Sequence, residues 1–148
     1  MITDVTIIST NLNKNILDDF KDYKIIDGNF YYEELLQMKK VIFFNVLSNL
    51  DEKKIKELFK FLNKNNVMFI NATNNIEEVL YTKNLIVNDE DKKVLEGTTI
   101  EVLKNEKTLR RLGFNLPFII QLSILLKDYE LTDKIFMNKE SLVKELWK

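Results

Sequence analysis

The sequence contains neither cysteine nor histidine, and it has only three glycines and one proline. Without cysteine, the chain can form no disulfide, no thiolate metal site and no cysteine nucleophile. Without histidine, it has no imidazole metal ligand, no Ser-His-Asp triad and no imidazole general base. These absences exclude a large share of the known chemistry of enzyme active sites.

An excess of charge and a membrane-spanning run are also absent. The 22 basic and 23 acidic residues give a formal net charge of −1, which argues against binding nucleic acid through bulk electrostatics. The longest apolar run, Leu116–Leu126, is about half of the roughly 20 residues that cross a bilayer. The first residues lack the basic segment and apolar run of a signal peptide. We therefore expect a cytoplasmic protein with no direct membrane insertion and no nucleic-acid partner.

The composition is that of a globular domain with alternating strands and helices. A chain of 148 residues with 45% hydrophobic and 30% charged residues can bury a core. Short β-branched or aromatic runs alternate with helical patterns, which predicts an α/β fold with a mainly parallel sheet. Strands are expected at residues 5–8, 24–26, 41–44 and 67–70, and an antiparallel hairpin is expected from 85–87 and 94–95. The hairpin turn should contain about four to six residues.

The clearest helix spans residues 51–63. Its apolar residues recur at helical spacing from Ile55 to Leu62, and Asp51 is a favourable N-cap. Shorter helices are expected at residues 15–23, 31–38 and 74–80. In the last of these, Glu77 and Glu78 are expected to be solvated carboxylates of the first turn.

The C-terminal part is predicted to be helical. Asn115 is expected to cap a helix at residues 118–128 that has Pro117 in its first turn, and Asn138 is expected to cap a last helix. The 118–128 helix is apolar almost all round, so more than one of its sides should be covered. Either the sheet or a two-fold partner would provide that cover.

From Val41 onward, the order of these parts resembles the C-terminal half of an ABC-transporter ATPase, from the Walker B strand to the switch strand. The matching parts are the buried strand, the segment Ser48-Asn49-Leu50-Asp51, the long helix, the next strand with residues 73–79, the hairpin and residues 95–102. The resemblance implies a truncated P-loop-NTPase-like α/β fold.

The end of the chain resembles one branch of that family. The run Leu112-Gly113-Phe114-Asn115-Leu116-Pro117-Phe118 is similar to the C-terminal extension of the cobalt-type, or energy-coupling-factor, transporter ATPases. In those proteins, the C-terminal helices help to pair two ATPase subunits. The resemblance implies a core at residues 1–105 and a helical dimerisation tail at residues 106–148.

The positions that would carry the chemistry of such an ATPase hold other residues. In the family, the Walker B strand ends in an Asp that helps to hold Mg²⁺ and a Glu that polarises the attacking water, and here Phe44 and Asn45 stand there. The switch His that contacts the γ-phosphate corresponds to Asn74. Phe cannot bind a metal ion, and the amide of Asn takes up no proton. The Asp of the D-loop is retained as Asp51, which can also be a plain helix cap.

The phosphate-binding loop is altered as well. A Walker A loop has the pattern G-x-x-x-x-G-K-[ST], because its glycines let backbone N–H groups surround the phosphates, and the sequence has no such run. Asn11–Leu17 follows the first strand and aligns with this loop, with Asn11 and Asn13 in place of glycines and Lys14 as the phosphate lysine. Otherwise, Lys14 is an ordinary surface lysine. The stretch before Val41 is too short for the family's signature loop and helical subdomain.

Two functions follow from the resemblance to these ATPases and from the substitutions at their motif positions. The first is a catalytically inactive ABC-ATPase-like protein, not an enzyme and without a cofactor, that acts as an interaction, scaffolding or regulatory module by dimerisation. The alternative is a non-hydrolysing subunit of a cobalt or vitamin transporter that binds ATP through Lys14 and reaches the membrane through the transporter complex. The partner would be a second copy or an intact ABC ATPase subunit. The expected interface residues are Asp51, Phe118, Ile119, Leu122 and Leu126.

Overall fold

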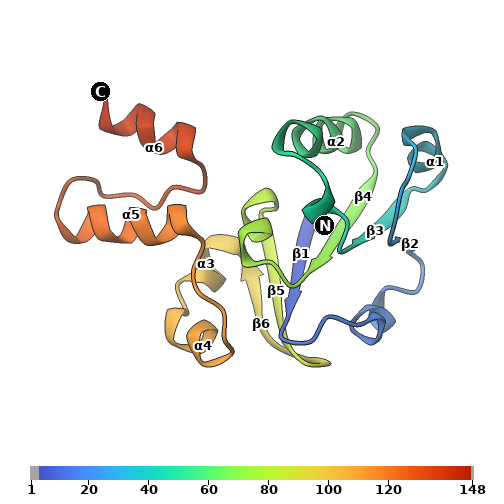
Figure 1. Cartoon of the computed structure of the whole chain (residues 1–148), viewed down its shortest axis with the longest axis horizontal. Coiled ribbons are helices and arrows are strands. Elements are labelled where there is room, and N and C mark those ends of the chain that lie inside the picture. Colours follow the sequence, from blue (N-terminus) through green and yellow to red (C-terminus); the bar gives the residue numbers. More distant parts are fainter. Residues whose placement is uncertain (1–3, 148) are drawn as a thin grey trace.

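One six-stranded sheet organises the computed structural model, which describes residues 4–147 (Figure 1). The strands are β1 (Asp4–Ser9), β2 (Lys24–Ile26), β3 (Lys40–Phe44), β4 (Met68–Thr73), β5 (Asn84–Asp89) and β6 (Lys92–Thr98). Their order is β2-β3-β4-β1-β5-β6, and all neighbours are parallel except the hairpin pair β5 and β6. The expected α/β class, a truncated P-loop-NTPase-like sheet with a hairpin, is confirmed.

The helices fall between and after these strands. The α-helices are α1 (Tyr32–Gln37), α2 (Glu52–Lys64), α3 (Thr99–Leu103), α4 (Glu106–Arg111), α5 (Phe118–Asp128) and α6 (Lys139–Leu146). The 3₁₀ helices are η1 (Lys14–Phe20), η2 (Leu47–Asn49) and η3 (Ile76–Tyr81). The helix predicted at residues 51–63 is confirmed as α2, with Asp51 as its N-cap, and it is the longest helix within residues 4–147.

Some local expectations are wrong. The short helices expected after β1 and β4 are present as the 3₁₀ helices η1 and η3, but each ends or begins a few residues away from its predicted bounds. The hairpin turn consists of Glu90 and Asp91 only, because both strands extend further into it than their apolar residues do. The N-cap of α5 is Pro117, because the helix begins at Phe118 and Asn115 lies too far before it.

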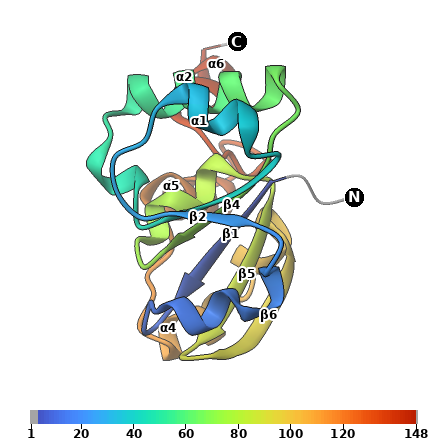
Figure 2. The same cartoon turned by 90° about the vertical axis from the view of Figure 1, so that its right-hand side faces the viewer.

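The two faces of the sheet are covered unequally. Side chains alternate between the faces along each strand. On one face, Phe43 packs in a cluster with residues of α1 and α2, and Leu85 packs in a cluster with residues of α3, α4 and α5. On the other face, Ile7, Ile42 and Ile70 form a cluster whose helical residues come from η1. Figure 2 shows this short segment (blue) in front of β1. Much of this second face therefore has only thin cover.

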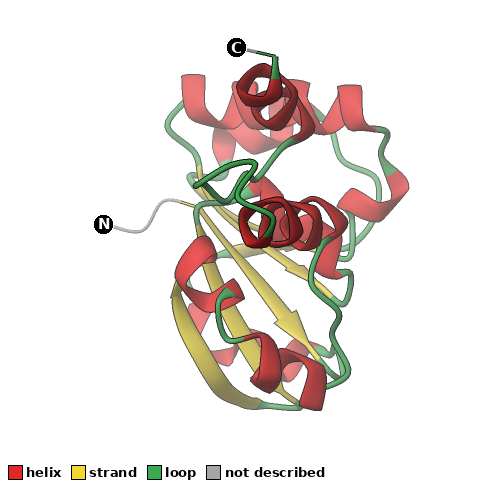
Figure 3. Ribbon diagram, turned by 90° about the vertical axis from the view of Figure 1, so that its left-hand side faces the viewer, coloured by secondary structure: helices red, strands yellow, loops and turns green. Residues whose placement is uncertain are grey.

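The C-terminal helices α5 and α6 lie at one side of the sheet in Figure 1, and Figure 3 views the molecule from that side. Ile120 of α5 joins the core cluster that contains Leu85. The hydroxyl of Ser123 accepts a hydrogen bond from the backbone N–H of Phe136 at 3.0 Å, which ties the following loop to α5. Asn138 caps α6, as expected. Within residues 4–147, every helix is too short or too polar to cross a membrane.

Candidate functional site

The strands β1, β4 and β3 are neighbours and end at the same edge of the sheet. Phe44 is the last residue of β3 and lies opposite Ala72 of β4, so Asn45 and Asn74 follow two neighbouring parallel strands. The structure therefore brings together the three positions that the resemblance aligns with the Walker B and switch residues. In open α/β sheets, ligands bind outside the carboxyl ends of the strands. This edge is the candidate functional site.

Asn45 and Asn74 present neutral amides at this edge. Asn45 leaves β3 with a φ of 54°, a left-handed conformation that Asn adopts more readily than most residues. Its backbone N–H donates a hydrogen bond to the carbonyl of Ala72 at 2.8 Å. Both side chains are exposed. Each amide can donate a hydrogen bond to a phosphate oxygen, but neither can accept a proton from water.

Lys14 reaches the same edge from the start of η1. Its Nζ lies 5.9 Å from the centroid of the Phe44 ring, within the range of a cation–π contact. The same Nζ donates a hydrogen bond to Oδ2 of Asp27 at 2.7 Å. This hydrogen bond lowers the pKa of Asp27 below its ordinary value. The ammonium group of Lys14 therefore lies beside Phe44 at this edge, and it is paired with a carboxylate.

The loop between β1 and η1 is fastened to the hairpin turn. The hydroxyl of Thr10 donates to Oδ1 of Asp89 at 3.0 Å and accepts from the backbone N–H of Glu90 at 2.8 Å. The side-chain amide of Asn13 donates to Oδ1 of Asp91 at 3.1 Å. Sequence reasoning missed these contacts because the two segments are about eighty positions apart and neither carries a pattern that indicates pairing. They fix the shape of the loop that aligns with the phosphate-binding loop.

The expected interface residues differ in exposure. Asp51 is exposed, and its carboxylate accepts a hydrogen bond from the backbone N–H of Lys54 at 2.8 Å. The side chain of Phe118 is 68% exposed. The others are partly buried: Ile119, Leu122 and Leu126. The C-terminal region also exposes large apolar residues that the sequence pattern did not single out, namely Leu125, Tyr129, Leu131, Val143, Leu146 and Trp147.

Glu78 differs most from expectation, because it is buried and not solvated. It is 3% exposed, and it accepts hydrogen bonds from Nδ2 of Asn71 at 3.1 Å and from Oγ1 of Thr73 at 2.8 Å. Burial raises the pKa of Glu78, and the two hydrogen bonds oppose that rise in part. Glu77, next to it, is exposed and accepts a hydrogen bond from the backbone N–H of Phe118 at 3.1 Å. The segment after Asn74 is thus linked both to the core and to α5.

Comparison with known proteins identifies relatives for more than half of the chain. The chain is 39% identical over 79 residues to the energy-coupling factor transporter ATP-binding protein EcfA1 of Bacillus subtilis, which is 53% of this chain and 28% of the relative. It is 34% identical over 95 residues to EcfA1 of Clostridioides difficile, which is 62% of this chain and 34% of the relative. It is 29% identical over 112 residues to EcfA1 of Mycoplasma mobile, which is 73% of this chain and 39% of the relative. No family model matches the chain.

These matches confirm the resemblance to energy-coupling-factor ABC ATPases, for a part of such a protein. The chain spans between 28% and 39% of the length of these three relatives. One expectation is contradicted. The chain was expected not to be an enzyme, whereas its relatives are named as ATP-binding proteins of energy-coupling-factor transporters. The substitutions at Phe44, Asn45 and Asn74 are not sufficient grounds for excluding ATPase activity in a chain whose relatives are named as ATP-binding proteins.

Proposed function

We propose that this chain, a partial relative of the energy-coupling-factor ABC ATPases, is the nucleotide-binding part of a transporter subunit of that type. The observation that carries the proposal is the place of Lys14. Its ammonium group lies above Phe44, at the carboxyl edge where three parallel strands end. A cation at this edge, in a relative of ATP-binding proteins, is suited to the phosphates of ATP.

Binding would exchange one partner of Lys14 for another. Asp27 is exposed, so its contact with Lys14 is screened by water and easily given up. A phosphate group carries more charge than a carboxylate and would compete for the same Nζ. The amides of Asn45 and Asn74 would then donate hydrogen bonds to the phosphate oxygens.

ATP hydrolysis would belong to the assembly. Asn45 and Asn74 supply no carboxylate that could hold Mg²⁺ or polarise water, and Phe44 supplies no ligand. We therefore expect a second ATPase chain, either another copy or an intact ABC ATPase subunit, to complete the site with its own acidic residues. The exposed Phe118, Tyr129 and Trp147 would give the C-terminal region an apolar surface for this pairing. Such a complex would hold the chain at the cytoplasmic side of a membrane.

Nucleotide binding can be tested by measuring the free energy of unfolding with and without ATP and Mg²⁺. At 100 times its dissociation constant, ATP should add roughly 2.7 kcal/mol. Lys14→Ala should weaken binding by about tenfold or more, since it removes a charged hydrogen-bond donor. Asp27→Asn should strengthen binding because it frees Lys14. Lys134→Ala, which changes another exposed lysine, is the matched control and should bind like the unaltered chain.

The proposal is wrong if millimolar ATP stabilises neither the unaltered chain nor Asp27→Asn. Pairing is measured separately, by light scattering of the chain alone and of its mixture with an intact energy-coupling-factor ATP-binding subunit. ATP turnover should be detected in an assembled state. A chain that stays monomeric in both samples would rule out the pairing.

A further inference from the structure

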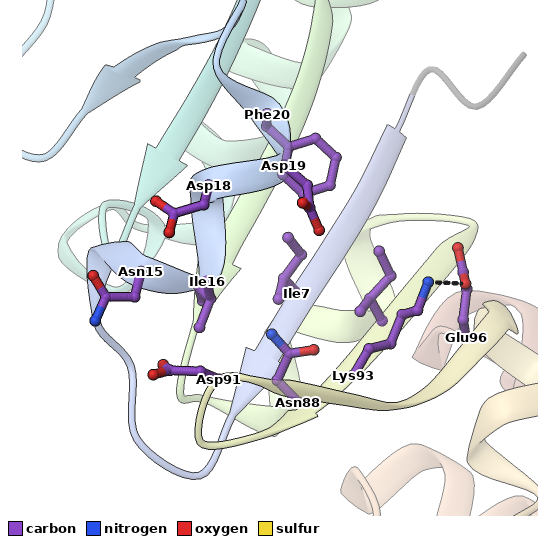
Figure 4. A pocket seen from close by; sticks show the side chains of 11 residues that line it. Ile7, Asn15, Ile16, Asp18, Asp19, Phe20, Asn88, Asp91, Lys93 and Glu96 are labelled. Atoms are coloured by element: carbon purple, nitrogen blue, oxygen red, sulfur yellow. Dashed lines mark hydrogen bonds and ion pairs between the residues drawn. The ribbon is translucent and has the colours of Figure 1, made fainter.

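A hollow lies between η1 and the β5–β6 hairpin, on the thinly covered face of the sheet (Figure 4). Its volume is about 630 Å³, which is within the range of small-molecule sites. The apolar part of its lining consists of Ile7, Ile16, Phe20 and Ile86. The hollow exists because η1 has only seven residues and leaves part of the sheet beside β1 open.

The rim of the hollow is acidic. Asp18 and Asp19 stand on η1, and the other carboxylates of the lining are Asp91 and Glu96. The one ammonium group of the lining, on Lys93, pairs with Glu96 at 2.7 Å. Figure 4 shows Asp91 and Glu96 at opposite ends of the hollow, with Asp19 between them. Four carboxylates against one paired ammonium leave an excess of negative charge around an apolar floor.

Asn88 adds a second, independent indication of a ligand. Its side chain is 6% exposed and points into the hollow in Figure 4. Its carbonyl oxygen Oδ1 is buried and accepts no hydrogen bond from any residue in the described range 4–147. A buried acceptor without a donor is unfavourable. A ligand that fits here should therefore bring hydrogen-bond donors as well as positive charge.

We propose that this hollow binds a linear polyamine. Its alkyl segments would lie on the apolar floor, and its ammonium groups would meet the separated carboxylates and Oδ1 of Asn88. A metal ion does not fit as well, because no three acidic side chains within residues 4–147 come close enough to hold one. The site is separate from the strand ends near Lys14, so this proposal does not depend on nucleotide binding.

The length of the polyamine should matter. A second hollow of about 410 Å³ shares Phe20, Ile86 and Glu96 with the first and continues as far as Glu101. The two hollows thus form a groove with carboxylates along it. A polyamine with three or four ammonium groups can reach more of these carboxylates than a diamine can, so affinity should rise from putrescine to spermidine to spermine.

Isothermal titration at constant ionic strength tests the proposal. Spermidine should bind more tightly than putrescine, and Mg²⁺ should give no saturable heat. The double change Asp18→Asn and Asp19→Asn should raise the dissociation constant of spermidine by about three- to tenfold, the effect of losing two exposed charge pairs. Asp133→Asn, which removes an exposed carboxylate outside the hollow, should leave the constant unchanged.

A second variant separates the hydrogen bond from the charge. Asn88→Ala removes the buried acceptor and should weaken spermidine binding, with circular dichroism used to verify that the variant is folded. Three results would overturn the proposal: equal binding of Mg²⁺, an unchanged constant in the double variant, or binding of a lysine-rich peptide in the absence of spermidine binding. The last result would assign the groove to a basic protein segment instead.

Discussion

Replacing Glu78 by glutamine should make the stability of the fold less dependent on pH. Glu78 is buried, and it lies beside Asn71 and Thr73 with no lysine or arginine paired to it among the described residues. Burial raises the pKa of Glu78 above its value in the unfolded chain. Between those two values, the folded state binds more protons than the unfolded state. The free energy of unfolding therefore falls as the pH rises through this window, and the loss persists above it.

The hydrogen bonds that the side chain at position 78 can form determine how much each substitution changes the free energy of unfolding at neutral pH. Glutamine has nearly the same size, and its carbonyl can accept from Thr73. Its N–H can donate to Oδ1 of Asn71, a buried acceptor without a partner within residues 4–147, once the Asn71 amide has turned. We expect the free energy of unfolding of Glu78→Gln to lie within about 1 kcal/mol of that of the unaltered chain. Glu78→Ala leaves two donors unpaired and should cost about 2 to 5 kcal/mol.

Urea unfolding at a series of pH values from about 4 to 8, spanning the ordinary glutamate pKa, provides the measurement. Glu33→Gln, which alters an exposed carboxylate on α1, is the matched control and should keep the pH dependence of the unaltered chain. Glu78→Gln should lose part of the pH dependence of the free energy of unfolding. If the curves of Glu78→Gln and the unaltered chain have the same slope throughout, Glu78 does not titrate as a buried group and the reasoning fails.

Three further substitutions test local parts of the structure by thermal or urea unfolding and by light scattering. Asp51→Ala removes the acceptor for the backbone N–H of Lys54 and should destabilise the fold by about 1 kcal/mol, whereas Asp51→Asn should keep most of the stability. Gly113→Ala should cost about 1 to 2 kcal/mol, because Gly113 has a φ of 92° and an added methyl group would meet no atom within 4 Å, so the cost lies in the backbone alone. Phe118→Ser should weaken pairing through the C-terminal region while changing monomer stability by less than about 0.5 kcal/mol, since its side chain is exposed.

Most of the sheet was predictable because its strands carry continuous apolar runs. The strand at residues 41–44 and the helix at 51–63 are confirmed with small shifts of their ends. The strand β4 extends to Thr73, three residues beyond the prediction, since Asn71 and Thr73 are polar yet buried. Their burial depends on Glu78, which comes from a separate segment. A local pattern cannot indicate a polar residue that is buried by a tertiary contact.

The candidate site was predictable only in part. The resemblance to ABC ATPases pointed to Phe44, Asn45 and Asn74. Hydrophobic patterning located the end of β3, which places Phe44 and Asn45, but it ended β4 three residues too early and so did not place Asn74 at the end of that strand. The pairing of Lys14 with Asp27 involves two exposed side chains 13 residues apart, and no periodicity in the sequence indicates it. The contacts between Thr10 and the hairpin turn are more distant still.

The segment from β1 to the end of η1 shapes both proposed sites. At its start, the loop is fixed to the hairpin turn through Asn13, and this places Lys14 at the strand ends. Further along, η1 ends at Phe20 and leaves the hollow beside β1 open. A longer helix in this position would cover the partly exposed Ile86 and would fill the hollow. The brevity of this 3₁₀ helix therefore accounts for the hollow on this face of the sheet, the proposed polyamine site.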